Sequence, residues 1–447
     1  MILASSLPAA ASAAAPRARP GAAPRPPRVS AAASSLAPRR ASEILRRRRP
    51  TPARVGVVVV RAEAPSTPSS TTPSALDVLQ GAKILAPNGG GLDEVRSSVS
   101  KYYGETLSTS ADLLTSACCT PNNLPRRVRD VLATVPDEVK AKYYGCGSPT
   151  PLGIRGLRVL DLGSGSGRDC YVAAALVGEE GKVVGVDMTD AQLEVAKRHA
   201  DAFCVETLGY AEPNVEFRKG QIEDLKAAGI EDESVDLIIS NCVVNLSPDK
   251  TAVLREAWRV LAYGGEFYFS DVYCDRRLPE ALRSHEQLLG ECLGGAMYVE
   301  DFKRLCAATG FADPRVLEGH EIAVEDEALA ELLGEAKFYS LTYRLFKLPP
   351  GRLETLCEDY GQFAVYKGTI EGHPHAYSLD DHHRIEKNKP FLVCGNTASM
   401  LGETWLGAHF DVHGDRETHY GLFDCGPAPV AESGGGGGGG AAGGACC

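Results

Sequence analysis

Residues 157–273 alternate between short apolar runs and longer segments whose apolar residues recur at helical spacing. The longer segments predict helices at 168–177, 190–205 and 249–265, the last closed by Gly264 and Gly265. Strand–helix alternation with short connections is typical of a parallel sheet covered by helices on both faces. The sequence therefore predicts a doubly wound α/β domain. The apolar runs predict its strands at 157–163, 182–188, 214–220, 234–241 and 266–273.

The regions on either side of this domain have different patterns. Helical spacing predicts helices at 92–107 and 124–145 before it. After it, residues 273–348 are predicted to be mostly helical. The stretch 349–430 contains predicted strands within 362–372 and 390–401, so we expect a small C-terminal domain whose fold the pattern does not define. The helices expected in the preceding region lie at 278–295, 299–310 and 325–338.

The first 61 residues carry twelve arginines, no lysine and one acidic residue, Glu43. The whole chain has a net charge of −11, so this segment at about +11 leaves about −22 for the rest. A start rich in Arg and Ser and poor in acids is typical of an organellar transit peptide. Residues 1–62 are therefore predicted to be a transit peptide that directs the protein to the chloroplast, with a mitochondrion or the cytosol as alternative locations. The composition is also compatible with a disordered tail that has no targeting function. Residues 63–90 read as a linker.

Bulk composition also narrows the class of protein. The acidic balance after residue 61 argues against a nucleic-acid partner, and no apolar run approaches the ~20 residues that span a bilayer. The 14 cysteines include no CxxC pair, and no secretory signal is evident. Neither a zinc ribbon nor a structural disulfide framework is therefore predicted. Scattered cysteines in a reducing compartment are usually small buried hydrophobic residues.

A glycine-rich turn, VLDLGSGSGRD at 159–169, follows the first predicted strand and opens a helix. Its glycines allow a sharp turn and a close approach by a ligand, which the helix N-terminal amides would face. Asp187 ends the next predicted strand, twenty residues after Gly167, where a carboxylate would meet a ribose diol. The turn alone is compatible with a nicotinamide, a flavin or a nucleoside cofactor, or with a helix cap that binds nothing.

The spacing of this turn is more informative. With Asp161 two residues before Gly163, the G-x-G-x-G pattern resembles motif I of the class I methyltransferases, which bind S-adenosylmethionine. The segment VEFRKGQIEDL at 215–225 fits a later motif of that family, in which Ile222 and Glu223 would flank the adenine. The resemblance implies a Rossmann-like doubly wound sheet.

Cys242 lies in SNCVVNL at 240–246, directly after a predicted strand. In class I methyltransferases the end of this strand lies under the transferred methyl group, so the resemblance places Cys242 beside the reacting carbon. A general base would be Asp, Glu or His, whereas a thiolate suits a soft substrate such as arsenic(III), which bonds three sulfurs. Further candidate ligands are Cys292 in GECLGG, Cys146 in YYGCG, and Cys118 or Cys119 in TSACCT.

Six motifs occur in order: SADLLTSACCT, YYGCG, LDLGSGSGRDCYV, SNCVVNLSPDK, GGEFYFSDVY and GECLGGAMY. Together they resemble the arsenite S-adenosylmethionine methyltransferases of the algal or plant type, densely over residues 95–345 and more loosely beyond. The resemblance implies that Cys242 and Cys292 bind arsenic. It also implies a second pair, Cys146 and Cys118, with Cys118 favoured over Cys119. Cys146 of this pair can complete the arsenic site. It implies cofactor binding by Tyr144, Asp161, Gly163, Ser164, Gly165, Asp187, Met188, Thr189, Gln192, Ile222, Glu223 and Asn241.

The resemblance also divides the chain into domains. The methyltransferase domain would span 91–272, and a helical arsenic-binding domain 273–348. A C-terminal domain would span 349–430, and a Gly-rich tail that ends in Cys446 and Cys447 follows at 431–447. The tail cysteines would either hand over arsenic or have no function. Cys170 and the other cysteines are expected to be structural.

The implied enzyme transfers methyl groups from S-adenosylmethionine to thiol-bound arsenic(III), for detoxification. Mono- and dimethylated products are expected, with trimethylation left open. Arsenic would arrive as a glutathione or dithiol complex, and thioredoxin or glutathione would reduce the thiols after each cycle. We expect a monomer. Two alternatives are a methyltransferase of a small organic acceptor, in which Cys242 is a packing residue, and a non-enzymatic thiol protein that sequesters or senses arsenic.

Overall fold

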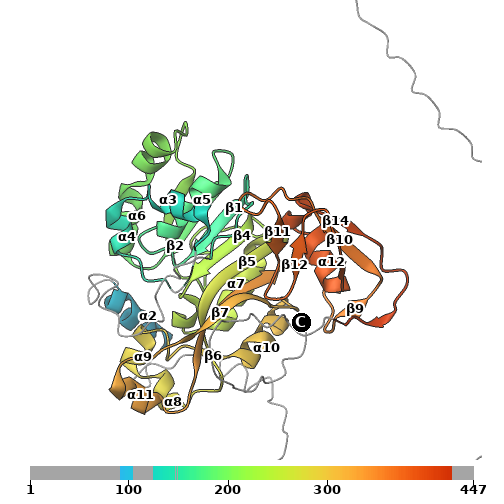
Figure 1. Cartoon of the computed structure of the whole chain (residues 1–447). Coiled ribbons are helices and arrows are strands. Elements are labelled where there is room, and N and C mark those ends of the chain that lie inside the picture. Colours follow the sequence, from blue (N-terminus) through green and yellow to red (C-terminus); the bar gives the residue numbers. More distant parts are fainter. Residues whose placement is uncertain (1–90, 104–123, 146, 148, 425–447) are drawn as a thin grey trace, which may run out of the picture. The chain divides into compact units, whose positions relative to one another are not determined.

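The computed structural model describes residues 91–103, 124–145, 147 and 149–424. Its main sheet has the strand order β3-β2-β1-β4-β5-β8-β7, with β6 paired to β5 (Figure 1). Strands β1 to β5 pair in parallel, whereas β8 is antiparallel to both β5 and β7. The predicted doubly wound α/β fold is thereby confirmed. The strands are β1 (Arg158–Leu162), β2 (Lys182–Asp187), β3 (Val215–Lys219), β4 (Val235–Asn241), β5 (Leu261–Cys274), β6 (Met297–Tyr298), β7 (Arg315–Ile322) and β8 (Phe338–Phe346).

The strand order reverses between β1 and β4. The chain builds outward from β1 through β2 to β3, then returns to place β4 on the other side of β1. Leu162 is in register with Val186 on β2 and Ser240 on β4, so the residues that follow these three meet at one edge of the sheet. Open α/β sheets bind ligands in the crevice at such a reversal, outside the carboxyl ends of the strands.

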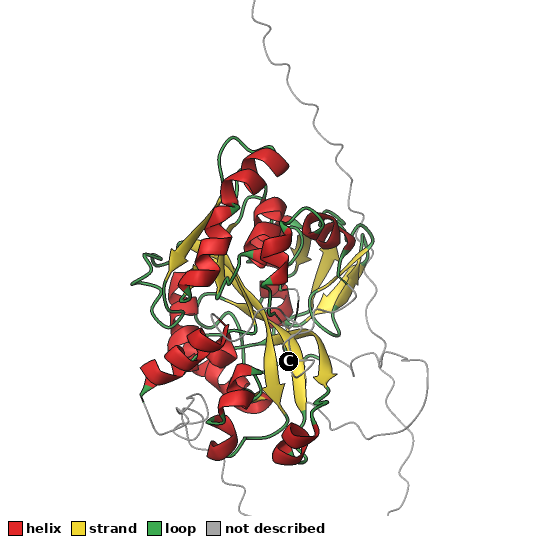
Figure 2. Ribbon diagram, turned by 90° about the vertical axis from the view of Figure 1, so that its left-hand side faces the viewer, coloured by secondary structure: helices red, strands yellow, loops and turns green. Residues whose placement is uncertain are grey.

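Helices pack on both faces of the sheet because successive strand residues point to opposite sides. Figure 2 shows helices on both sides of the sheet. On β4, Leu237 and Ile239 join one apolar core together with α5, whereas Ile238 joins a second core together with α7. The described helices are α2 (Leu92–Lys101), α3 (Arg126–Leu132), α4 (Asp137–Ala141), α5 (Arg168–Val177), α6 (Asp190–Arg198), α7 (Lys250–Val260), α8 (Glu280–Arg283), α9 (Glu286–Gly290), α10 (Val299–Thr309), α11 (Glu327–Leu333) and α12 (Gly395–Gly402). Helices of other types are the π-helical η4 (Ala202–Thr207) and the 3₁₀ helices η5 (Val244–Leu246) and η6 (Trp405–Ala408).

The predicted end of the helix at 249–265 is wrong. Helix α7 ends at Val260, and β5 begins at the next residue. Gly264 and Gly265 lie inside β5, where the register against β4 shifts and Gly264 has φ of 84°. The glycines therefore permit a strand irregularity and do not stop the helix.

The expectation of a mostly helical 273–348 region missed three strands, the short β6, which pairs with β5, and the longer β7 and β8. Strand β8 pairs with β5 from Glu266 opposite Phe346 to Cys274 opposite Phe338, and β7 pairs with β8. Both strands extend the main sheet, so the region is not separate from it. The reason is tertiary, since strand preference depends on the neighbouring strand more than on the local sequence.

The C-terminal region forms small sheets. The prediction of strands is confirmed at β10 and β13, but the residues after β13 form α12 in place of more strand. Arg344 on β8 donates to Glu266 on β5 at 2.6 and 2.9 Å within the main sheet. This pair ties the C-terminal region to the sheet, because Trp405 Nε1 donates to Glu266 at 2.8 Å and Arg344 donates to the hydroxyl of Tyr377 at 2.9 Å. The strands are β9 (Glu358–Asp359), β10 (Gln362–Tyr366), β11 (Ala376–Ser378), β12 (Arg384–Glu386), β13 (Pro390–Val393), β14 (Phe410–His413) and β15 (Gly421–Leu422).

Several predictions fall on other parts of the chain. The transit peptide, the linker and the Gly-rich tail lie outside the described residues, as do Cys118, Cys119 and Cys146. Among the residues that are described, no helix is long and apolar enough to cross a bilayer.

Candidate active site

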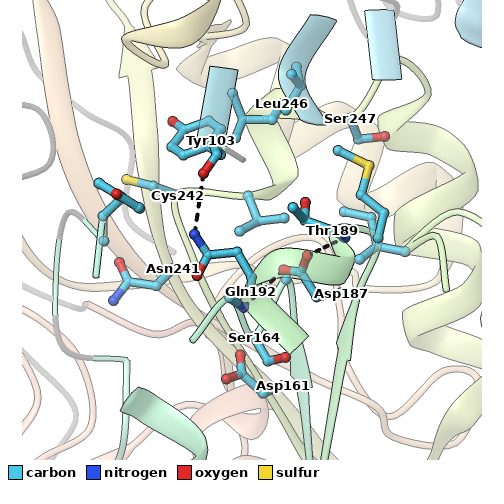
Figure 3. A pocket seen from close by; sticks show the side chains of 18 of the residues that line it. Tyr103, Asp161, Ser164, Asp187, Thr189, Gln192, Asn241, Cys242, Leu246 and Ser247 are labelled. Carbon is cyan, nitrogen blue, oxygen red and sulfur yellow. Dashed lines mark hydrogen bonds between the residues drawn. The ribbon is translucent and has the colours of Figure 1, made fainter. Parts of the chain in front are cut away.

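A pocket lies at the carboxyl ends of β1, β2 and β4, at the reversal of strand order. Arg96, Val99 and Tyr103, from α2 and the residues after it, also line this pocket. Figure 3 shows Tyr103 and Cys242 near one end and Asp161 and Ser164 at the other. The structure brings together all twelve residues predicted to bind the cofactor: Tyr144, Asp161, Gly163, Ser164, Gly165, Asp187, Met188, Thr189, Gln192, Ile222, Glu223 and Asn241.

The glycine-rich turn is held against β2. The amides of Gly163 and Ser164 both donate to the carbonyl oxygen of Val186, at 2.8 and 3.1 Å. Gly163 has φ of 71°, and a Cβ atom there would lie 2.5 Å from the side chain of Val243. A side chain at this position would therefore be strained and would clash, which explains the glycine.

Asp187 fixes the other side of the turn. Its Oδ2 accepts a hydrogen bond from the Gly165 amide at 2.9 Å, and its Oδ1 accepts one from the Thr189 amide at 2.8 Å (Figure 3). Burial raises the pKa of this carboxyl, while the two amides oppose the rise. Each carboxylate oxygen has a second lone pair, so Asp187 can also accept hydrogen bonds from a ligand diol.

The polar groups of the pocket fit S-adenosylmethionine. Ser164 Oγ and Gln192 Oε1 are buried, and within the described residues neither has a hydrogen-bond partner. Such atoms are costly unless a ligand satisfies them. Asp161 and Asp169 also line the pocket, and burial together with the Asp169 charge raises the pKa of Asp161 well above its usual range. The acidic and unpaired polar groups of this cavity suit a ligand with a cationic sulfonium and several hydroxyl and amine groups.

Asn241 holds the segment beside predicted Cys146. Its Oδ1 accepts from the Gly147 amide at 3.0 Å, and its Nδ2 donates to the Gly147 carbonyl at 2.9 Å and to Asp169 at 3.0 Å. It also donates to the hydroxyl of Tyr143. The residues on either side of position 146 are therefore fixed to the end of β4, next to the pocket.

Cys242 and Cys292 lie together although fifty residues separate them. Cys292 Sγ is 3.6 Å from the carbonyl oxygen of Cys242, and both side chains are buried, 0% and 3% exposed. Cys242 lines the pocket at the end of β4, and Cys292 follows α9. In this structure Cys242 is disulfide-bonded and Cys292 is a free thiol. Cys242 thus lines the pocket, while Cys292 Sγ lies against the backbone of Cys242 and 3.7 Å from the hydroxyl of Tyr103.

Both cysteines have an unusual backbone. Cys242 has φ of 55° and Cys292 has φ of 63°, and in the described part of the chain only Glu233 and Asn388 share this feature among non-glycine residues. The left-handed region costs a side-chain-bearing residue roughly 1–2 kcal/mol. Such conformations persist where surrounding contacts hold them, and they concentrate at functional sites.

Two buried ionisable residues, Lys250 and Asp271, hold the loop that carries Cys242 through hydrogen bonds to its backbone. Lys250 Nζ donates to the Asn245 carbonyl at 3.0 Å, and Asp271 accepts from the amides of Asn245 at 3.0 Å and Val272 at 2.8 Å. Burial raises the pKa of Asp271 to about 7 and lowers the pKa of Lys250 to about 8. Neither residue was singled out from the sequence.

The other described cysteines lie away from the pocket lining. Cys170 is buried on α5, as expected of a structural residue, and its thiol donates to Asp161 Oδ2 at 3.1 Å. Cys204, Cys274, Cys306 and Cys394 are free and buried. Cys357 is disulfide-bonded, a bond that the sequence did not predict.

Sequence reasoning missed Tyr103, whose ring lies edge-on to that of Tyr144 with centroids 5.6 Å apart. A signal was available, because the tripeptide YYG occurs twice, at 102–104 and 143–145. The two copies supply neighbouring aromatic walls of one pocket.

Comparisons with known proteins agree with this geometry. A family model described as a methyltransferase domain matches residues 155–310. An arsenite methyltransferase of Aquipseudomonas alcaligenes is 55% identical over 333 residues, 74% of this chain and 95% of that protein. The arsenite methyltransferase of Mus musculus is 46% identical over 71% of this chain and 83% of its own length.

A solved structure is also similar. The crystal structure of an arsenic(III) S-adenosylmethionine methyltransferase from Chlamydomonas reinhardtii aligns with a TM-score of 0.66 and 64% sequence identity, covering 68% of this chain and all of that one. The glycine-rich turn, Asp187 and the paired cysteines therefore lie in a chain whose relatives share most of its length. The chain belongs to the arsenite methyltransferase family.

Proposed function

We propose that this protein methylates arsenic(III) with S-adenosylmethionine, holding the arsenic on the thiolates of Cys242 and Cys292. The observation that carries the proposal is the position of these two cysteines. They are distant in sequence, both have left-handed backbone conformations, and one lies in the wall of the cofactor pocket. A soft ion such as arsenic(III) binds thiolate sulfur strongly, so two cysteines beside a methyl donor fit this substrate once the disulfide of Cys242 is reduced.

The residues of the chain act mainly by positioning. Asp187, Ser164 and Gln192 would hold the polar groups of the cofactor, which when bound supplies an activated methyl group. Cys242 and Cys292 would hold arsenic at the adjacent end of the pocket, with Cys146 as the predicted third ligand. Because the lone pair of arsenic(III) carries no proton, the site needs no general base. Holding two reactants in register is a large source of rate acceleration.

The remaining parts of the proposal concern the thiols and the product. A methylated product is formally pentavalent, and two electrons from a pair of protein thiols would reduce it and leave a disulfide. Cys118 and Cys146 are the predicted pair. Thioredoxin or glutathione would then restore the thiols, and arsenic would arrive as a glutathione or dithiol complex. We further propose that the enzyme is a monomer, that it detoxifies arsenic in the chloroplast, and that it forms mono- and dimethylated products.

The proposal is tested by turnover of the purified chain with arsenite, S-adenosylmethionine, glutathione and a thioredoxin system. The products are separated and identified by mass spectrometry. Cys242→Ala and Cys292→Ala should abolish methylated arsenic while S-adenosylmethionine still binds. The matched control is Cys306→Ala, which removes a buried free thiol from the apolar core behind α7 and should keep activity. Methylated arsenic that persists after loss of Cys242 and Cys292 would refute their role as arsenic ligands. A wild-type chain that binds S-adenosylmethionine but forms no methylated arsenic would favour an organic acceptor.

A further inference from the structure

Tyr103 lies where the cofactor pocket meets the cysteine-bearing loop. It follows α2, and its ring packs in a small apolar cluster with Val99, Leu289 and Leu246. Its backbone carbonyl accepts a hydrogen bond from Gln192 Nε2 at 3.3 Å, on the cofactor side of the pocket (Figure 3). One residue therefore contacts both halves of the site.

The hydroxyl of Tyr103 reaches the arsenic side. It donates to the carbonyl oxygen of Gly290 at 2.9 Å, and it lies 3.7 Å from Cys292 Sγ. Gly290 is the last residue of α9, and the final carbonyl groups of a helix lack an intrahelical donor. Tyr103 supplies that donor two residues before the left-handed Cys292, and it also brings a hydroxyl to the sulfur.

Tyr102 contacts the same loop through other groups. Its hydroxyl donates to Glu291 Oε1 at 3.1 Å, and its ring packs on Gly290, where a Cβ atom would lie 2.8 Å from the ring. Tyr102 is not part of the pocket lining. A comparison of the two adjacent tyrosines therefore distinguishes the effect of loop packing from the effect of contact with the Cys292 thiol.

We propose that Tyr103 is a positioning residue for arsenic binding: its hydroxyl holds the end of α9 and the Cys292 thiol in the geometry that receives arsenic(III). The inference rests on the proposed function. Removing the hydroxyl leaves the ring, its contact with Tyr144 and the backbone bond to Gln192 in place. Arsenic affinity should then fall while cofactor affinity is kept.

The test compares Tyr103→Phe with Tyr102→Phe in the full, reduced chain. Arsenite binding is measured by equilibrium dialysis with arsenic quantified by mass spectrometry, and S-adenosylmethionine binding by calorimetry. Tyr103→Phe should weaken arsenite binding about 3- to 10-fold, the size expected for one hydrogen bond, and change S-adenosylmethionine affinity less than about twofold. It should also raise the KM for arsenite more than the KM for S-adenosylmethionine. Tyr102→Phe should leave both affinities within about twofold of wild type.

Three results would overturn the inference. Arsenite affinity could be unchanged in Tyr103→Phe, or both tyrosine variants could lose it equally, which would assign the effect to loop packing. Loss of S-adenosylmethionine binding in Tyr103→Phe would assign the hydroxyl a general structural role. Wild-type protein that neither binds nor methylates arsenite would refute the proposed function itself, whereas normal wild-type turnover with an unaffected Tyr103→Phe refutes only the role of Tyr103.

Discussion

Replacing Asp187 with asparagine should weaken cofactor binding strongly, with little effect on folding. In the structure each carboxylate oxygen accepts one backbone amide, from Gly165 at 2.9 Å and from Thr189 at 2.8 Å. These bonds join the glycine-rich turn to the end of β2 and leave lone pairs for a ligand. Asparagine keeps one acceptor oxygen but replaces the other with an NH₂ group, which faces an amide donor and cannot accept its hydrogen bond.

The expected loss follows from this geometry. Asparagine also lacks the charge that would strengthen a hydrogen bond from a ligand diol, and one hydrogen bond to a charged acceptor contributes about 1.5–3 kcal/mol, which corresponds to about a 10- to 150-fold change in affinity. The amide left without an acceptor also lies beside the cofactor site. We therefore expect the dissociation constant for S-adenosylmethionine to rise about 10- to 150-fold in Asp187→Asn.

Isothermal titration calorimetry of S-adenosylmethionine measures this effect. The matched control is Asp190→Asn, three residues further along, whose carboxylate pairs with Lys219 and is 68% exposed. Because exposed ion pairs contribute little, the control should bind within about twofold of wild type. Urea unfolding of both variants verifies that they are folded.

The reasoning about Asp187 fails if its asparagine variant binds the cofactor as tightly as wild type. Equal losses in Asp187→Asn and Asp190→Asn would also refute it, since a general change of charge near the turn would then explain both. A variant that is unfolded in buffer would show that the two amide bonds hold the domain and not only the site.

Two further predictions concern stability. Arg344→Met leaves the fully buried Glu266 carboxylate without its guanidinium partner. The free energy of unfolding, measured by urea titration, should therefore fall by about 3–5 kcal/mol. A loss below about 1 kcal/mol would contradict a stabilising role of the buried pair. The pKa of Asp271 is raised from 3.8 to about 7 in the folded state, so the folded state binds this proton more tightly than the unfolded state does. The stability that this proton contributes is therefore lost as pH rises through about 7. Asp271→Asn should remove that component, and identical pH profiles of unfolding for the two proteins would argue against it.

The sequence predicted the α/β fold and the helix-opening glycine-rich turn because both depend on local patterns. Apolar runs and helical spacing identified β1 to β4, and the helix after the glycine-rich turn was predicted with its observed bounds, Arg168–Val177. Asp187 was identified because a parallel sheet places the ends of adjacent strands at one edge. The twelve predicted cofactor residues line one pocket for the same reason.

Predictions failed where a distant partner decides the local structure. The glycines after α7 suggested a helix stop, yet pairing with β4 makes them part of β5. Residues 338–346 form a strand because β5 offers an unpaired edge to receive them. Arg344 and Glu266 are separated by 78 residues, and the local sequence around neither residue predicts that they pair.

The sequence by itself therefore determined the class of fold, the cofactor turn and, through its ordered cysteine motifs, the family. These features are encoded in spacing, because backbone periodicity and turn chemistry act over a few residues. Only the tertiary structure placed Cys292 against Cys242 and Tyr103 against both the cysteine loop and Gln192. Those contacts join segments 50 to about 190 residues apart, and they exist only because packing of the whole domain brings α2, β4 and α9 to one end of a single pocket.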